Sequence, residues 1–115
     1  APAQGAIAIE CRTDDARARE WLAAIDHGPS RAEAMAERAL LAALGGSCHS
    51  PIAVLCDAKG DMLTMRAALF SPNGVERVDG SATFPSDDDI APTRLAEDLL
   101  ARATGGIAAH FSGAR

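Results

Sequence analysis

Cys48 is the residue of this chain best placed for covalent chemistry. It lies in the run Gly46-Ser47-Cys48-His49-Ser50, which we interpret as a loop between the end of a helix and the start of a strand. Its small neighbours leave the thiol open to a bulky partner, and a thiolate is a good nucleophile toward an electrophilic carbon. The alternative is a small side chain that only packs inside the loop, because cysteine is among the most buried residue types.

The other two cysteines are interpreted as packing residues. Cys11 follows an apolar run that resembles a strand, and Cys56 ends a second one. Three cysteines without a C-x-x-C pair make a poor disulfide framework and a poor zinc site. Reduced thiols in a cytosolic protein are the simplest interpretation, so we expect a cytoplasmic location.

Histidines offer little support for catalysis. His49 is next to Cys48, but adjacent residues of an extended chain point to opposite sides, so we expect a solvated loop histidine rather than an activating base. His27 and His110 stand near expected helix ends and are predicted to lie at the surface.

Two charged groups have ordinary explanations. Asp87-Asp88-Asp89 lacks the glycine and the distal glutamate of a calcium loop, so we expect a solvated run at a helix N-terminus and no metal. Glu37-Arg38 offers a general base and a phosphate ligand, but the polar side of a helix with ordinary ion pairs is the favoured interpretation.

Composition excludes several classes of protein. The chain has 115 residues, of which 48% are hydrophobic and 23% charged, as in an ordinary globular domain. Its net charge is −5, Lys59 is the only lysine, and aromatic rings are few, which argues against a nucleic-acid surface. Apolar runs are too short for a membrane span. The first residues do not resemble a signal peptide and look like the middle of a longer chain.

Hydrophobic periodicity predicts the elements that must position Cys48. We expect a buried strand over residues 4–11 and a helix that ends near Ile25. A second helix would run from a Ser30/Glu33 capping box to Leu44 and end at Gly45-Gly46. The remaining expected elements are strands over residues 51–56, 62–70 and 75–84, with turns at 59–61 and 71–74, a helix from Pro92 to Gly105-Gly106, and a tail over 107–115 that adds a short helix or frays.

These elements predict an α+β fold with a three-stranded antiparallel sheet covered by helices on one face. A strand and a helix from an adjoining domain would precede it, because the first strand has no evident partner in this chain. The expected division is 1–26 for the last strand and helix of a preceding catalytic domain and 27–115 for the C-terminal domain.

Several of these segments together resemble porphobilinogen deaminase, also called hydroxymethylbilane synthase. They are the segment 4–12 with its opening Gln4-Gly5-Ala6, the helix end 36–44 with Glu37-Arg38, the loop Cys48-x-x-Pro51-Ile52, the turn 71–74 and the helix segment 95–100. The family usually has glycine at the position of Ala3, where it would permit a positive φ.

The resemblance implies a function. The family enzyme has three domains, and its third is a three-stranded antiparallel sheet covered by helices. Its loop cysteine, here Cys48, holds a dipyrromethane cofactor by a thioether. This primer receives four porphobilinogen units, each with loss of ammonia. Hydrolysis then releases hydroxymethylbilane for haem or chlorophyll biosynthesis. By the same resemblance Gln4 and Gly5 lie near the cofactor and contact it.

The resemblance also implies that the catalytic and substrate-binding residues lie on other domains of the enzyme. The catalytic Asp and the Arg residues for the substrate carboxylates belong to the first two domains, and nothing in this sequence matches them. The implied partners are therefore the N-terminal domains of the same enzyme and, in the intact enzyme, porphobilinogen, with no nucleic acid and no membrane. The chain alone would be inactive.

Two other classes stay open from the residues alone. One is a non-enzymatic α+β domain that binds a partner through the exposed loop thiol. The other is a stand-alone thiol redox protein, which needs a Cys48 of low pKa and lacks a resolving cysteine nearby in the sequence.

Overall fold

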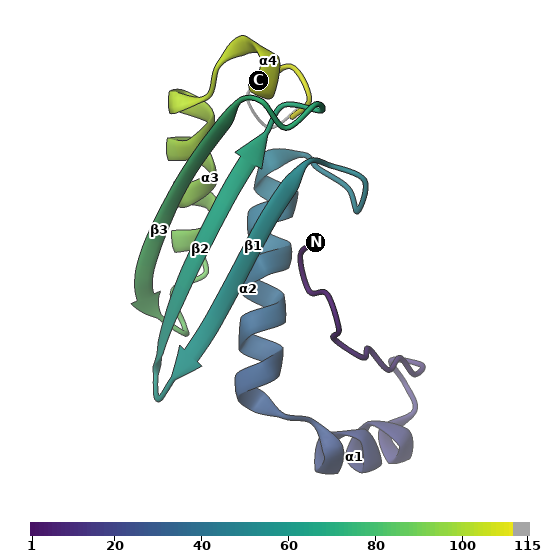
Figure 1. The fold of residues 1–115 in the computed structure, drawn as a ribbon. Coiled ribbons are helices and arrows are strands. Elements are labelled where there is room, and N and C mark those ends of the chain that lie inside the picture. The colour runs from purple at the N-terminus through teal and green to yellow at the C-terminus, as the bar shows by residue number, and fades with distance from the viewer. Residues whose placement is uncertain (112–115) are drawn as a thin grey trace.

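A three-stranded antiparallel sheet forms the centre of the molecule (Figure 1). The computed structural model of the chain describes residues 1–111. Strands β1 (Ile52–Lys59), β2 (Met62–Phe70) and β3 (Arg77–Pro85) pair in sequence order, so β2 is central and the other two are edges. Leu69 of β2 faces Ile52 on one side and Val78 on the other. The predicted meander is confirmed, with β1 three residues longer at its end than expected.

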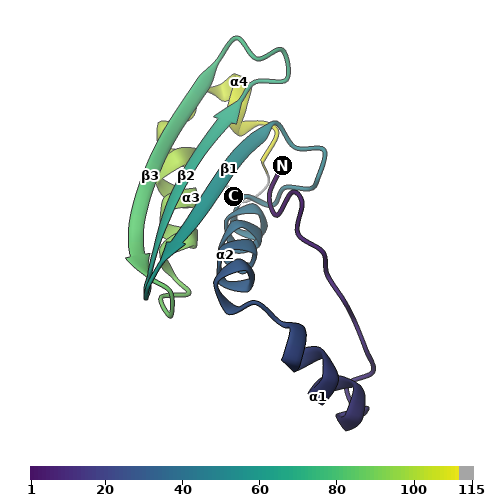
Figure 2. The ribbon, with the colours of Figure 1, turned by 60° about the horizontal axis from the view of Figure 1, so that its bottom comes forward.

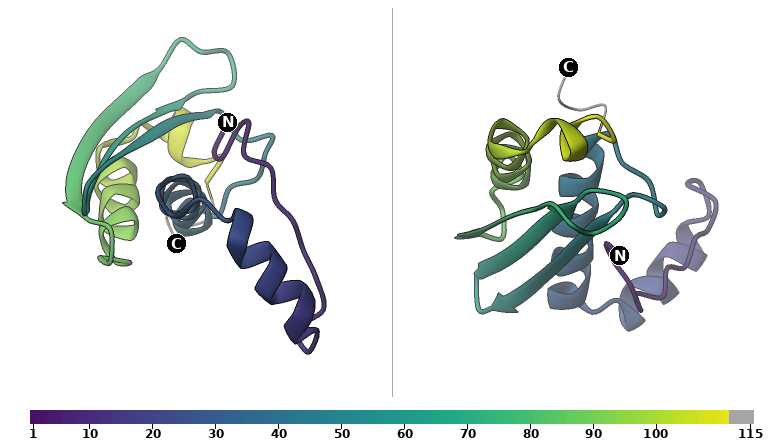
Figure 3. Two further views of the ribbon diagram at one scale, coloured as in Figure 1. Left: turned by 90° about the horizontal axis from the view of Figure 1, so that it is seen from below. Right: turned by 45° about the horizontal axis from the view of Figure 1, so that its top comes forward.

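Two helices cover one face of this sheet, as predicted. Helix α2 (Gly28–Leu44) packs against β1 and α3 (Ala91–Arg102) against β3, and the two helices contact each other (Figures 1 and 3). Successive side chains of a strand point to opposite faces of the sheet, so about every second side chain enters the core, as β2 shows. The largest side chains that are almost completely buried are Leu40, Leu44, Leu63, Met65, Leu69, Leu99, Ile107 and Phe111.

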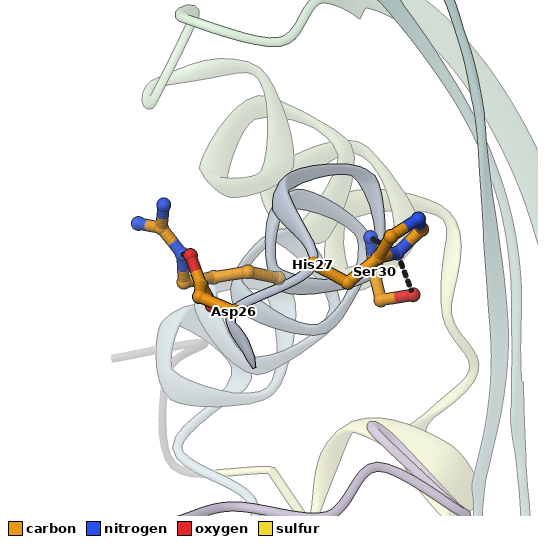
Figure 4. A network of polar contacts seen from close by, with 4 residues as sticks. Asp26, His27 and Ser30 are labelled. Atoms are coloured by element: carbon orange, nitrogen blue, oxygen red, sulfur yellow. Dashed lines mark hydrogen bonds and ion pairs between the residues drawn. The ribbon is translucent and has the colours of Figure 1, made fainter. Parts of the chain in front are cut away.

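The start of α2 differs from the prediction. The helix begins at Gly28 and not at a Ser30/Glu33 capping box. His27 is the N-cap, and its Nδ1 accepts the Ser30 N–H at 3.2 Å and lies 2.7 Å from the Ser30 Oγ (Figure 4). Pro29 fits the first turn because it has no N–H to satisfy there. In the same close-up, Asp26 accepts from the Arg31 Nε at 2.9 Å.

The acidic run before α3 is exposed at Asp87 and Asp89 and half-buried at Asp88, which accepts hydrogen bonds from the start of the helix. The Asp88 Oδ1 accepts the N–H groups of Ile90 and Ala91, each at 3.1 Å. Among the described residues, no cluster of His, Cys, Asp or Glu is arranged to hold a metal. The run thus lies at the N-terminus of a helix, as the sequence predicts, with Asp87 and Asp89 exposed.

The end of α3 lies earlier than predicted. The helix stops at Arg102, and Gly105-Gly106 opens a short helix α4 (Gly105–Ala108) rather than terminating α3. Arg102 explains the position of this end, because its guanidinium bonds Asp98 at 2.8 Å and the Asp79 carbonyl at 2.9 Å. Of the tail expected over 107–115, residues 112–115 lie outside the described residues.

The N-terminal segment contradicts the predicted strand. Residues 6–12 have no regular secondary structure, and Ile7 is 91% exposed. A strand needs a neighbour to pair its backbone groups, and the described residues supply none. Cys11 is consequently exposed and not a packing residue. Helix α1 (Ala16–Ile25) follows as predicted, has no buried residue, and extends away from the sheet (Figures 1 and 2).

No helix within residues 1–111 is both long and apolar enough to cross a membrane.

Candidate functional site

The end of α2 fixes where the Cys48 loop begins. Gly45 has a φ of +66°, a left-handed conformation that glycine adopts without steric penalty. Its N–H donates to the Ala42 carbonyl, and the Gly46 N–H donates to the Leu41 carbonyl, each at 3.0 Å. This pair of bonds reverses the chain immediately after the last buried leucine of the helix, Leu44.

Cys48 occupies the tip of a hydrogen-bonded turn. The Ser50 N–H donates to the Ser47 carbonyl at 3.0 Å, and the Ser47 N–H donates to the Ser50 Oγ at 2.8 Å. The His49 N–H donates to the Ser47 Oγ at 3.2 Å. Cys48 and His49 are thus the two central residues of a turn that Ser47 and Ser50 close from both sides.

The Cys48 side chain is exposed and carries a free thiol. In the described part of the chain no hydrogen bond joins this thiol to the His49 ring, and His49 is itself exposed, as predicted. The turn therefore presents the sulfur to solvent without an activating base from the same loop. An open thiol on a rigid turn fits a covalently held organic group, because nothing packed over the sulfur must be displaced.

Gln4 and Gly5 lie in a second turn at the start of the chain. Ala3 has a φ of +56° and Gly5 a φ of +83°. The Ala6 N–H donates to the Ala3 carbonyl at 3.1 Å, and the Gln4 Oε1 accepts from the Ala1 nitrogen at 3.1 Å. Both Gln4 and Gly5 are exposed. The positive φ that the sequence suggested for this turn is therefore present, but an alanine adopts it.

Glu37 contradicts the expectation of a polar helix surface. Its side chain is buried, with a relative exposure of 7%. The Oε2 atom accepts the Cys56 N–H at 3.0 Å, and the Oε1 atom accepts the Ala3 N–H at 2.7 Å. The spacing of Glu37 to Leu40 and Leu44 places it on the buried stripe of α2, a signal that could have identified it. Its neighbour Arg38 is exposed, as expected.

Cys56 is buried beside this carboxylate. Burial first, and then the negative charge of Glu37, raise the pKa of the Cys56 thiol to about 11. The thiol therefore stays protonated at neutral pH and acts as a packing residue, as predicted.

An open cleft of about 700 Å³ lies between the N-terminal segment, α1 and the first half of α2. Its lining combines apolar side chains, among them Ile7, Ile9 and Met35, with Arg19, Arg31 and Arg38. Ile9 and Met35 are more than half exposed. This surface is more apolar than an ordinary solvated face and is not covered by any of the described residues.

Within residues 1–111, no hydrogen bond or ion pair joins the remaining candidate residues to the Cys48 turn. His27 lies at the opposite end of α2. His110 follows α4 and is exposed. The Asp87-Asp88-Asp89 run precedes α3. Among the described residues, the candidate site consists of Cys48 with its turn and the segment with Gln4 and Gly5 that Glu37 holds.

Known proteins have sequences similar to that of this chain. The family model of the C-terminal domain of porphobilinogen deaminase matches residues 31–101, which include Glu37, the Cys48 turn and all three strands. The porphobilinogen deaminase of Sphingopyxis alaskensis is 43% identical over 113 residues, covering 97% of this chain and 35% of the relative. That of Paracoccus denitrificans is 45% identical over 104 residues, covering 90% and 33%. The chain spans about a third of the length of these curated relatives.

Proposed function

This chain belongs to the porphobilinogen deaminase family, and from that premise we propose that it is the C-terminal part of a hydroxymethylbilane synthase. In this proposal the intact enzyme condenses four porphobilinogen molecules into hydroxymethylbilane with loss of ammonia, a step of haem or chlorophyll biosynthesis. Cys48 holds the dipyrromethane primer by a thioether. The observation that carries the proposal is the exposed Cys48 thiol on a closed turn within the matched range.

The chemistry asked of Cys48 is a single substitution. Its thiolate attacks the carbon that carries the amino group of an aminomethylpyrrole, a C–S bond forms, and the C–N bond breaks. Ammonia leaves with the thiol proton, so no oxidant or reductant is needed. The bound dipyrromethane would supply the free pyrrole carbon from which the chain grows. The turn's contribution is to hold the sulfur outward at a fixed place, with the small Ser47 beside it.

Gln4 and Gly5 are proposed contacts of the primer. Both are exposed in a turn whose backbone is tied to α2 and β1 through Glu37. Exposed polar groups on a fixed backbone can receive a ligand without a large ordering cost.

The proposed partners are the N-terminal domains of the same enzyme, which the relatives' greater length accommodates. We place the domain division at 1–26 and 27–115, because α1 has no buried residue and extends away from the sheet. The apolar cleft with Arg19, Arg31 and Arg38 would then be covered by those domains. The catalytic Asp and the substrate-binding Arg residues would come from them, so the chain alone is inactive, and we propose a cytoplasmic enzyme.

The proposal is tested by combining this chain with the N-terminal two-thirds of the Sphingopyxis relative and measuring hydroxymethylbilane formation. Cys48→Ser should abolish formation and leave the circular dichroism spectrum unchanged. Cys11→Ser is the matched control, because it removes the other exposed thiol, and it should retain turnover. Turnover by the Cys48→Ser enzyme would overturn the proposal.

A further inference from the structure

Glu37 is a buried carboxylate that the proposed chemistry does not use. The three ion pairs among the described residues, Arg31–Asp26, Arg77–Asp79 and Arg102–Asp98, all lie elsewhere. Within residues 1–111, its hydrogen-bond partners are two backbone N–H groups that are 34 and 19 residues away in sequence. A buried charge is costly unless it is hydrogen-bonded, so these two contacts account for its burial.

We propose that Glu37 is a positioning residue that fixes the segment carrying Gln4 and Gly5 against the outer edge of β1, beside the Cys48 turn. This inference rests on the proposed function, which gives Gln4 and Gly5 their role at the primer. Glu37 itself touches no substrate in the proposal and acts only through the backbone of Ala3.

The first contact anchors Glu37 to the sheet. β1 is an edge strand, and the Cys56 N–H is donated to Glu37 rather than to β2. An edge strand leaves every second N–H without a strand partner. The Glu37 Oε2 accepts one of them from the helix packed on the same edge, so the carboxylate is held between α2 and β1.

The second contact extends this anchor to the start of the chain. The Glu37 Oε1 accepts the Ala3 N–H at 2.7 Å, a short charge-assisted bond. Ala3 is the one non-glycine residue within 1–111 with a positive φ, a conformation that is unfavourable for an L residue with a side chain. The bond to Glu37 helps to hold Ala3 there, and Ala3 sets the direction of Gln4 and Gly5.

Figures 1, 2 and 3 agree that the first residues run beside the loop between α2 and β1. The same helix that ends at the Cys48 turn therefore carries, near its middle, the acceptor for the neighbouring segment. A carboxylate suits this position because its two oxygens accept two donors at once. An amide has one acceptor oxygen and would leave one N–H without a partner.

The structural arm of the test uses amide hydrogen exchange on the chain itself. In Glu37→Gln, the single amide oxygen should stay with the buried Cys56 N–H, because an unpaired donor costs most where water cannot reach it. The part-buried Ala3 amide should then exchange about tenfold faster, and the Cys56 amide should change less. Glu33→Gln is the matched control, one turn earlier on α2, and should change neither amide. Ala3→Gly keeps the N–H and should keep its protection. Unchanged exchange of Ala3 in Glu37→Gln overturns the inference.

The functional arm measures the rate at which Cys48 acquires the primer in the chain combined with the relative's N-terminal two-thirds. Glu37→Gln should slow acquisition by about tenfold and lower the urea midpoint, because one buried hydrogen bond is lost, while the alkylation rate of Cys48 stays within the range of Glu33→Gln. Equal acquisition rates overturn the positioning role. If Glu37→Gln does not fold, Ala3→Pro removes the same donor from outside the core. Because proline also cannot adopt the φ of +56°, acquisition should slow by at least as much, and an unchanged rate overturns the inference.

The two arms separate two failures. If the wild-type chain acquires no primer, the proposed function is wrong and the role at the primer falls with it. If the wild type acquires primer and Glu37→Gln does so equally fast, only the inference is wrong.

Discussion

Gly46, two residues before Cys48, should be costly to replace. A Cβ added at this position would lie 2.7 Å from the Leu41 Cδ1 and 2.9 Å from the Ser50 Oγ. Leu41 is only partly buried, and its methyl can rotate away. Ser50 cannot move as easily, because its Oγ accepts the Ser47 N–H and the adjoining Pro51 carbonyl accepts the Phe70 N–H at 3.0 Å.

The loss of stability expected for Gly46→Ala therefore comes first from the contact between the added Cβ and Ser50. Loss of the Ser47–Ser50 hydrogen bond amounts to about 1 kcal/mol. Crowding between the added Cβ and the Leu41 side chain costs about 1 kcal/mol more. This is the low end of the usual range for overpacking, because the Leu41 methyl can rotate away. We expect the free energy of unfolding to fall by about 2 kcal/mol. The alkylation rate of Cys48 should change as well, since the Ser47 N–H no longer donates to the Ser50 Oγ.

Urea unfolding followed by far-ultraviolet circular dichroism measures this change. Trp21 is exposed on α1, away from the core, so its fluorescence would not report on the sheet. Gly28→Ala at the other end of α2 is the matched control, because no atom lies within 4 Å of its added Cβ. Gly28→Ala should be neutral or slightly stabilising. If Gly46→Ala costs no more than Gly28→Ala, the close packing inferred at this turn is refuted.

Three further predictions use the same unfolding assay. Ala3→Gly should raise the free energy of unfolding by about 1 kcal/mol, because glycine accepts the φ of +56° at this position; a decrease would contradict the backbone described. Because the Cys56 pKa is raised from 9.0 to about 11, the folded chain keeps a proton that the unfolded chain releases. Stability should therefore fall between pH 9 and pH 11, by about 2–3 kcal/mol at most, and Cys56→Ala should lack this slope. Ile7→Ser should change stability by less than about 0.5 kcal/mol, since Ile7 is 91% exposed, but should weaken association with the N-terminal domains; a large loss in the chain alone would contradict its exposure.

The strands and the Cys48 turn could be predicted because their signals are local. Apolar residues alternate with other residues along β2, and Leu63, Met65 and Leu69 identify its buried face. Gly45-Gly46 marks the end of α2. Cys48 follows from small neighbours between two such elements. In each case the residues that carry the signal are the residues that form the structure.

The partners of Glu37 and the structure of the N-terminal segment could not be predicted, because both depend on residues that are distant in sequence. The helical spacing of Glu37 to Leu40 indicates that its side chain is buried. No local pattern reveals the donors that this burial requires, which come from Ala3 and Cys56. Cys11 follows an apolar run typical of a strand, yet a strand forms only where another strand pairs with it. His27 was missed as an N-cap because Ser30 is the commoner capping residue.

The mass of this chain after co-expression with the N-terminal two-thirds of the Sphingopyxis relative tests the central claim most directly. The account predicts an adduct on Cys48 equal to two porphobilinogen molecules less two ammonia molecules, present in Cys11→Ser and absent in Cys48→Ser. A bare Cys48 in a complex that forms hydroxymethylbilane, or the same adduct in Cys48→Ser, would contradict it.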